Sequence, residues 1–196
     1  MAEKRTLHTA NRIITEQAIE INRLQKIIDK QHHQLAIAQI DGLTGLLRPE
    51  GFKDNVEKEL SRSRRTGHHL SVFVLDLNNL KTVNDNHGHN AGDEMLKGFA
   101  SLLKKSVRAG DTVARTGGDE FMILLPEQNK AMAELAKKKL LKKIDAGKES
   151  LQYFFGAAVG LASTSQGFKH FESLYEAADM AMYKHTTELK KEVTPA

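Results

Sequence analysis

The first forty residues carry a seven-residue hydrophobic repeat, uninterrupted by proline or glycine from residue 5 to residue 40. Apolar residues recur at Leu7, Ile14, Ile21, Ile28 and Leu35. The second core position of the later heptads holds Gln17, Leu24, Gln31 and Ala38. Isoleucine at the first position with leucine at the second favours two parallel helices. We therefore expect residues 1–40 to form a coiled coil that dimerises the chain. A single helix packed on its own domain is the alternative.

Beyond residue 40 the pattern changes to helical stretches separated by short apolar runs. Pro49 suits the first turn of a helix that Gly67 would close. The nearly continuous apolar run 70–77 predicts a buried central strand. The expected elements are helix 49–66, strand 70–77, a short helix 80–83, helix 91–107, a hairpin around 112–125, helix 128–146, strand 153–162 and helix 171–190. This order predicts an α+β domain over residues 41–190, with one sheet, helices on its faces and a tail at 191–196.

Composition excludes several classes of protein. The 196 residues suffice for one domain with a core plus an appendage, and the lack of cysteine excludes disulfide scaffolds and thiolate metal sites. The formal net charge of +4 suits a phosphate-binding protein and is too small for a nucleic-acid signature. No apolar run approaches the roughly 20 residues that span a bilayer, and the N-terminus lacks a signal-peptide core. We expect a cytoplasmic protein that binds neither nucleic acid nor membrane.

The candidate chemistry begins with a glycine pair followed by two carboxylates, Gly117 to Glu120. The glycines predict a hairpin turn with positive φ, which would hold Asp119 and Glu120 at its tip. Adjacent carboxylates can bind a hard cation, although a solvated surface turn is the plainer interpretation. Asp76, at the end of the buried run, favours the cation site over the solvated turn. A carboxylate at the end of a buried strand is energetically costly unless it is paired or metal-bound.

These residues resemble motifs of the GGDEF family, the diguanylate cyclases. The signature corresponds to Gly117–Phe121, and the motif that opens the domain to Asp41–Leu46. The family's nucleotide-binding segment resembles Asp76–Lys81 together with Asn84-Asp85, Gly88-His89 and Gly92-Asp93, and the start of its last helix resembles Ala178–Tyr183. The resemblance covers roughly residues 40–190.

The resemblance implies a fold like the palm of nucleotide cyclases and polymerases, with a ferredoxin-like antiparallel sheet flanked by helices. It also implies a homodimer in which each protomer holds one GTP, and two GTP become cyclic di-GMP with release of two pyrophosphates. Asp119 and Glu120 would be catalytic. Asp76, the Leu77 carbonyl, Asp119 and Glu120 would hold Mg²⁺, or alternatively Mn²⁺.

The same resemblance suggests where GTP binds. Asn84 and Asp93 would read guanine, with His89 beside the nucleotide. Asp93 has an alternative role as a first-turn helix acid, and a zinc site at His87 and His89 lacks further ligands. The remaining substrate-binding residues would be Asn79, Leu80, Lys81, Gly117, Gly118 and Lys190.

A second site is suggested by Arg108 and Asp111, which match the family's R-x-x-D motif at its usual distance from the glycines. Bound cyclic di-GMP there would inhibit turnover. An ordinary surface ion pair is the alternative.

The chain departs from the family pattern at three places. Arg48-Pro49 replaces the usual Asn-Arg, Asn78 replaces an aspartate, and Thr186 stands where a lysine neutralises triphosphate, with Lys190 in place of an arginine. The missing cation favours an alternative function, in which a weak or inactive domain binds GTP or cyclic di-GMP as a signalling module. A third hypothesis is an interaction protein in which the coiled coil carries the function. No sensor domain is recognisable, so the input acts through the coil or the chain is part of a longer protein.

Overall fold

The computed structural model describes residues 17, 20–27, 39–154 and 156–193. Residues divide into two units, 1–39 and 40–196. In the first unit residues 20–27 are helical, and the side chains of Ile21 and Leu24 are exposed. Most of the expected coiled coil, including Leu7, Ile14, Ile28 and Leu35, lies outside the described residues, so its dimerisation stays a prediction.

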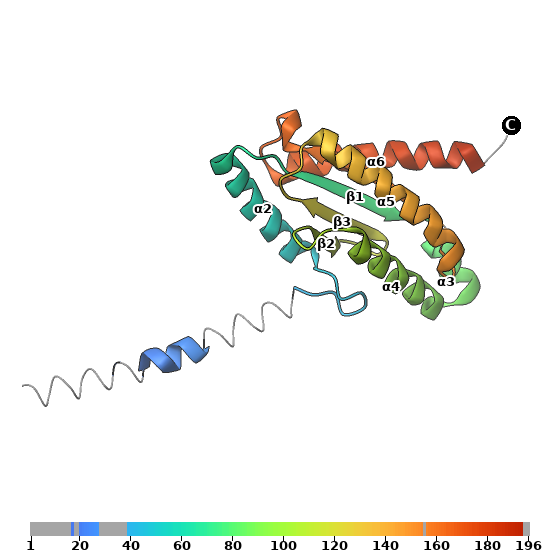
Figure 1. Ribbon diagram of the computed structural model, residues 1–196. Helices are drawn as coiled ribbons and strands as arrows, with labels where there is room; N and C mark the ends of the chain where they lie inside the picture. The colour runs from blue at the N-terminus through green and yellow to red at the C-terminus, as the bar shows by residue number, and fades with distance from the viewer. Residues whose placement is uncertain (1–16, 18–19, 28–38, 155, 194–196) are drawn as a thin grey trace, which may run out of the picture. The chain divides into compact units, whose positions relative to one another are not determined.

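The second unit contains a four-stranded sheet and its flanking helices (Figure 1). The elements are α2 (Pro49–Thr66), β1 (Ser71–Leu77), α3 (Leu80–His87), α4 (His89–Ser106), β2 (Thr112–Arg115), β3 (Glu120–Leu125), α5 (Lys130–Ser150), β4 (Ala157–Ser163), the 3₁₀ turn η1 (Thr164–Gln166) and α6 (Phe171–Val193). The strands lie in the order β2-β3-β1-β4, and each neighbouring pair is antiparallel. The α+β fold expected from the sequence is confirmed.

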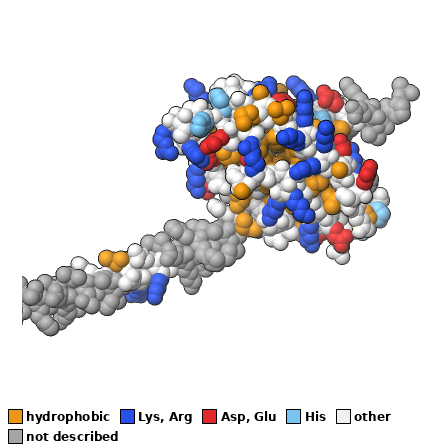
Figure 2. Space-filling model, viewed as in Figure 1, with side chains coloured by type: hydrophobic (Ala, Val, Ile, Leu, Met, Phe, Trp, Pro, Cys, Tyr) orange, Lys and Arg blue, Asp and Glu red, His pale blue; other side chains and the backbone are white. Residues whose placement is uncertain are grey.

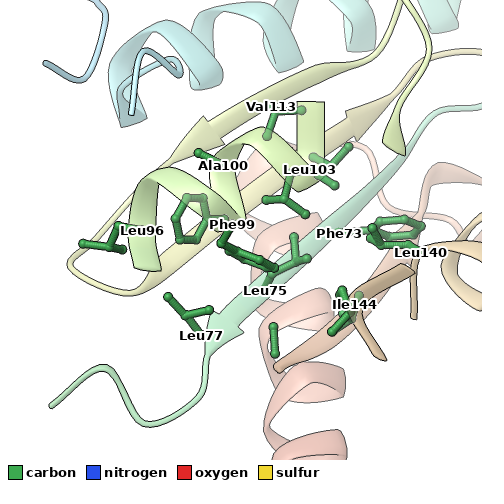
Figure 3. Close-up of a cluster of buried hydrophobic side chains, with 14 of the residues drawn as sticks. Phe73, Leu75, Leu77, Leu96, Phe99, Ala100, Leu103, Val113, Leu140 and Ile144 are labelled. Carbon is green, nitrogen blue, oxygen red and sulfur yellow. The ribbon is translucent and has the colours of Figure 1, made fainter. Parts of the chain in front are cut away.

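Each face of the sheet has its own hydrophobic cluster, because successive side chains of a strand point to opposite faces. Figure 3 shows Phe73, Leu75 and Leu77 of β1 packed with residues of α4 and α5 on one face. On the other face Val72 and Val74 pack with α2 and α6. The near-continuous apolar run of β1 therefore reflects burial on both faces, as expected for a central strand.

Several elements differ from the predicted bounds, among them α5, which spans Lys130–Ser150 where 128–146 was expected. The strand expected from residue 153 begins at Ala157, because Tyr153 has φ 59° and Gly156 has φ 107°, values that break an extended strand. Phe154 in this turn stacks on Phe99 with ring centroids 5.4 Å apart, so its apolar character serves the core and not the sheet. The short helix expected at 80–83 extends to His87.

The ends of α2 agree with the prediction, with Pro49 in the first turn and Gly67 in the left-handed conformation at the C-cap.

Within the described ranges, no helix combines the length and apolar character needed to span a bilayer.

Candidate functional site

The carboxylates expected to act together lie on neighbouring strands. Asp76 of β1 pairs directly with Glu120 of β3 in the antiparallel register. Asp76 alternates with the inward residues Val72 and Val74, and Glu120 with Met122, so both side chains face the α2/α6 side of the sheet. The Leu77 amide donates to the Asp119 carbonyl at 2.9 Å, which ties the end of β1 to the turn before β3. The structure thus brings together groups that are about forty positions apart in sequence.

The turn between β2 and β3 differs from the one predicted. Neither Gly117 nor Gly118 has positive φ, and Glu120 is the first residue of β3 and not part of the tip. The Thr116 and Gly117 amides donate to the Glu120 carbonyl at 2.9 and 3.4 Å. Gly117 matters for the position of Glu120, since a Cβ there would lie 2.9 Å from Glu120 Oε2 and would displace this carboxylate. The absence of a side chain leaves room for the carboxylate.

The surroundings of Glu120 are electronegative. Burial raises the pKa of its carboxyl group, and the charges of Asp119 and Asp179 raise it further. Burial also raises the pKa of Tyr175, with the same effect from Glu120 and Asp179. Asp179 and Tyr175 come from α6, so this helix adds negative charge to a site that motif matching placed on β1 and β3. A bound cation would relieve the repulsion.

The donor set fits a magnesium ion that also binds a nucleotide. Within the described part of the chain, no three His, Cys, Asp or Glu side chains form a ready-made ion cluster. Magnesium commonly binds one or two carboxylates and takes its other ligands from water and substrate phosphates. Paired Asp76 and Glu120, with Asp119 adjacent, supply that kind of partial shell.

Arg115 is a site residue that the sequence analysis missed. Its guanidinium donates twice to the Gly118 carbonyl, from Nε at 3.2 Å and from Nη2 at 2.7 Å, and Nη1 lies 3.4 Å from Asp41 Oδ1. Asp41 also accepts from the Thr44 amide at 2.9 Å. Burial alone would raise the pKa of Asp41, but the Thr44 hydrogen bonds and the Arg115 charge outweigh it and lower that pKa. The loop of residues 41–47 therefore braces the glycine turn.

The expected guanine-reading residues lie on α3 and α4. Gly92 allows close approach of the Asn84 carboxamide, because a Cβ at residue 92 would lie 1.9 Å from Asn84 Oδ1. Asn84 is thereby held against the turn of α4 that carries Asp93. The alternative role for Asp93 as a first-turn acid is not supported, since α4 begins four residues earlier, at His89.

The other proposed nucleotide-binding residues surround the end of β1. Asn79 adopts φ 64° and precedes α3, which begins with Leu80 and Lys81. Lys81 and His89 are exposed. Lys190 belongs to α6, and its side chain lies outside what the structure describes. The Thr186 hydroxyl donates to the Met182 carbonyl of its own helix at 3.1 Å.

The Arg108–Asp111 pair forms a compact turn. The Arg108 amide donates to Asp111 Oδ2 at 2.9 Å, and the Asp111 amide donates to the Arg108 carbonyl at 3.0 Å. The Arg108 side chain is 64% exposed while that of Asp111 is 6% exposed, and Nε lies 4.0 Å from Oδ2. Asp111 thus shapes the turn, and the guanidinium remains accessible, unlike that of a tight ion pair.

Comparison with protein families gives a match over most of the chain. The profile of the family described as "Diguanylate cyclase, GGDEF domain" matches residues 38–192. Diguanylate cyclase DgcS of Shewanella oneidensis is 31% identical over 178 residues, which cover 90% of this chain and 60% of that protein. Diguanylate cyclase DgcP of Pseudomonas aeruginosa is 35% identical over 153 residues, covering 75% of this chain and 22% of that protein. The chain thus spans less than two thirds of either relative.

Solved structures show the same fold. A sensory box/GGDEF family protein from Caulobacter crescentus aligns with a TM-score of 0.69 and 30% identity, covering 76% of this chain and 99% of that one. A microbial GGDEF domain studied in its interaction with cyclic di-GMP aligns with a TM-score of 0.66 and 30% identity, covering 77% and 94%.

Proposed function

Because the chain belongs to the GGDEF domain family of diguanylate cyclases, we propose that it condenses two GTP into cyclic di-GMP and releases two pyrophosphates. The observation that carries this proposal is the direct pairing of Asp76 with Glu120, next to Asp119, at the end of the sheet where α3 begins. A carboxylate pair on neighbouring strands, partly buried beside α6, suits metal-assisted phosphoryl transfer better than a solvated turn does.

In the proposed reaction, the 3′-hydroxyl oxygen of one GTP forms a bond to the α-phosphorus of the other, and pyrophosphate leaves. A hairpin carboxylate accepts the hydroxyl proton. Asp119 and Glu120 are the two candidates for that role, since both lie beside Asp76 at the end of the sheet. When bound between Asp76, Leu77 and the hairpin acids, Mg²⁺ or Mn²⁺ would neutralise charge on the phosphates.

Guanine selection would rest on Asn84 and Asp93. A carboxylate accepts from both N1–H and the exocyclic amine of guanine, a pair of donors that adenine does not present. The steric fit between Asn84 and Gly92 supports this role, because it fixes the carboxamide beside Asp93. Lys81 and the amides near Asn79 and Leu80 would face the phosphates.

Catalysis would require a homodimer, since each protomer binds one GTP. The exposed Ile21 and Leu24, on the helix of residues 20–27, support a partner helix for the N-terminal repeat.

The accessible Arg108 side chain supports product inhibition, because a guanidinium can bind both guanine edges and phosphates.

One observation favours a second candidate, a binding module with little turnover. Thr186 turns its hydroxyl to the Met182 carbonyl and supplies no positive charge where the family has a lysine. Such a domain would bind GTP or cyclic di-GMP without releasing pyrophosphate at a useful rate.

A single assay separates the candidates. The full chain is incubated with GTP, ATP or both, plus Mg²⁺ or Mn²⁺, and products are identified by mass. Cyclic di-GMP from GTP alone, abolished by Glu120→Gln, would support the cyclase. Nucleotide binding without pyrophosphate release at any protein concentration would favour the binding module.

A further inference from the structure

The last turn of α5 reaches the end of the sheet where the nucleotide is proposed to bind. Figure 1 shows this end of α5 near α3, the helix that follows β1. The turn after α5 contacts α3 directly, because the ring centroids of Tyr153 and His87 lie 4.8 Å apart. Gly147 holds the last turn of α5 close to α4, since a Cβ there would lie 2.7 Å from Leu102 Cδ1. A side chain on this turn is therefore carried by a well-packed element near the end of β1.

Lys148, on this turn, extends its side chain across Gly156 towards Asn78. A Cβ on Gly156 would lie 2.7 Å from Lys148 Cε, so the lack of a side chain there leaves room for the lysine. Lys148 Nζ and Asn78 Nδ2 would lie 3.5 and 3.7 Å from that same Cβ, so both side chains border one small space. Gly156 has φ 107°, and its carbonyl accepts from the Asn78 amide at 3.0 Å. The backbone before β4 thus places the Lys148 ammonium beside the residue that follows β1.

This position is close to the proposed metal ligands. Asn78 follows Asp76 by two residues, which span roughly 7 Å in a strand, and it precedes Asn79, the N-cap of α3. The carboxylates of Asp76 and Glu120 repel the phosphates of a nucleoside triphosphate, which brings several negative charges of its own. Phosphoryl transfer sites therefore place positive side chains around the phosphates in addition to the metal. The ammonium of Lys148 lies where such a charge is needed.

The partner of Lys148 in the structure is one that a phosphate could replace. Lys148 Nζ lies 2.9 Å from Asp145 Oδ1, and the two side chains are 45% and 68% exposed. An exposed pair within one helical turn contributes little, whereas a charge-assisted hydrogen bond to a phosphate oxygen is stronger. Figure 2 shows lysine and arginine side chains spread over the face that carries α4 and α5. Exposure alone therefore does not distinguish Lys148, but its place across Gly156 does.

We propose that Lys148 is a substrate-binding residue, whose ammonium leaves Asp145 and pairs with the β- and γ-phosphates of GTP. This inference rests on the proposed binding of GTP at the end of β1. The lysine would supply from α5 the positive charge that the Thr186 hydroxyl, bound to its own helix, does not supply from α6. It would also help pyrophosphate to leave, because the charge that develops on the departing phosphates lies next to the ammonium.

The test measures nucleotide binding by the full chain and its variants in the presence of Mg²⁺. The ligand is a GTP analogue with a methylene bridge between the α- and β-phosphates, which blocks release of pyrophosphate, so calorimetric titration measures affinity without turnover. GMP, which lacks the β- and γ-phosphates, is titrated in parallel. Lys148→Met keeps an apolar stem across Gly156 and removes the charge. Since Lys148 is exposed, this variant should melt at nearly the same temperature as the parent.

We expect Lys148→Met to bind the analogue roughly three- to tenfold more weakly and to bind GMP like the parent. Asp145→Asn frees the ammonium from its partner in the structure, so this variant should bind the analogue about twofold more tightly or better. Lys142→Met is the matched control, because Lys142 is an exposed lysine of α5 more than one turn before Lys148. It removes the same charge and should bind both nucleotides like the parent.

The outcomes separate this inference from the proposal on which it rests. If Lys148→Met binds the analogue like the parent, or weakens GMP equally, Lys148 does not hold the outer phosphates and the inference is wrong, although cyclic di-GMP synthesis by the parent would stand. If the parent binds the analogue but makes no cyclic di-GMP from GTP, the cyclase proposal fails, while the binding titrations still decide the role of Lys148. If the parent binds no guanine nucleotide, both fail.

Discussion

At the scale of single residues, Gly117 leaves room for the Glu120 carboxylate because it has no side chain. Gly117 has no unusual φ, yet a Cβ there would lie 2.9 Å from Glu120 Oε2. The carboxylate is the end of a flexible side chain, so it would move instead of unfolding the turn. An acid that must meet a hydroxyl and a metal tolerates little displacement, because an error near 1 Å can cost about a hundredfold in rate.

Gly117→Ala should therefore lower kcat roughly ten- to a hundredfold and leave the melting temperature nearly unchanged. Steady-state kinetics with GTP and a thermal melt measure the two effects. Gly42→Ala is the control, since a Cβ at Gly42 would meet nothing within 4 Å, and it should retain both properties. A Gly117→Ala enzyme with unaltered kcat would mean that the position of Glu120 is not set by the turn.

Asp41 links stability to pH. Its carboxylate is held by Thr44 and Arg115, which lower its pKa despite partial burial. A lowered folded-state pKa means that the stabilisation is present above the unfolded pKa of about 3.9 and is lost as the pH falls through the folded value.

Asp41→Asn should therefore destabilise the protein by roughly 1 kcal/mol at neutral pH, after allowance for solvent screening of a partly exposed pair. The difference from the parent should begin to shrink below about pH 3.9 and should disappear once the pH falls below the lowered pKa of Asp41 in the folded protein. Denaturant unfolding at several pH values measures it. A difference that persisted unchanged in acid would show that packing, not the charge of Asp41, causes the loss.

At the scale of elements, α6 approaches the edge strand β4 with almost no space between them. A Cβ on Gly160 would lie 1.9 Å from the Ala178 carbonyl and 2.4 Å from the Met182 amide. One turn further on, His185 Nδ1 accepts from the Val159 amide at 2.9 Å. These contacts fix the helix that brings Asp179 and Tyr175 to Glu120, so the packing of α6 and the charge of the site are coupled.

Gly160→Ala should destabilise the domain by about 3 kcal/mol or more, since backbone and not a flexible side chain opposes the added atom. A thermal melt should show a loss of roughly 6–12 °C for a chain of this size. Gly98→Ala in α4 provides the comparison, because its Cβ would make an ordinary 3.5 Å contact with Leu151, and a helical alanine is favoured. Equal melting temperatures for the two variants would contradict the close approach.

At the scale of the whole molecule, the domain of residues 40–196 has its own sheet and two hydrophobic clusters, so it should fold without the first 39 residues. The proposed reaction nevertheless joins two GTP held by two protomers. A coiled coil would raise the effective concentration of one catalytic half near the other.

Deletion of residues 1–39 should lower specific activity severalfold at low protein concentration and restore it as the concentration rises, because dimerisation becomes the limiting step. Initial rates over a range of protein concentrations, compared with the full chain, provide the measurement. The same specific activity at every concentration in both proteins would remove the N-terminal repeat from the mechanism.

Local patterns in the chain were enough to predict the order of elements, the α+β fold and the family. Pro49 and Gly67 limit α2, and the apolar run 70–77 forms a strand buried on both faces, because turn chemistry and periodicity depend on neighbouring residues. The sequence also indicated that Asp76 lies near Asp119 and Glu120, whereas the place of Glu120 on β3 and its direct pairing with Asp76 came from the structure.

Contacts between distant segments had to come from the folded chain. The link from Arg115 to Asp41, 74 positions away, the crowding of Gly117 by Glu120, and the repulsion from Asp179 all depend on how strands and helices pack. Motif spacing identifies which groups take part, but desolvation and steric fit are properties of the assembled fold.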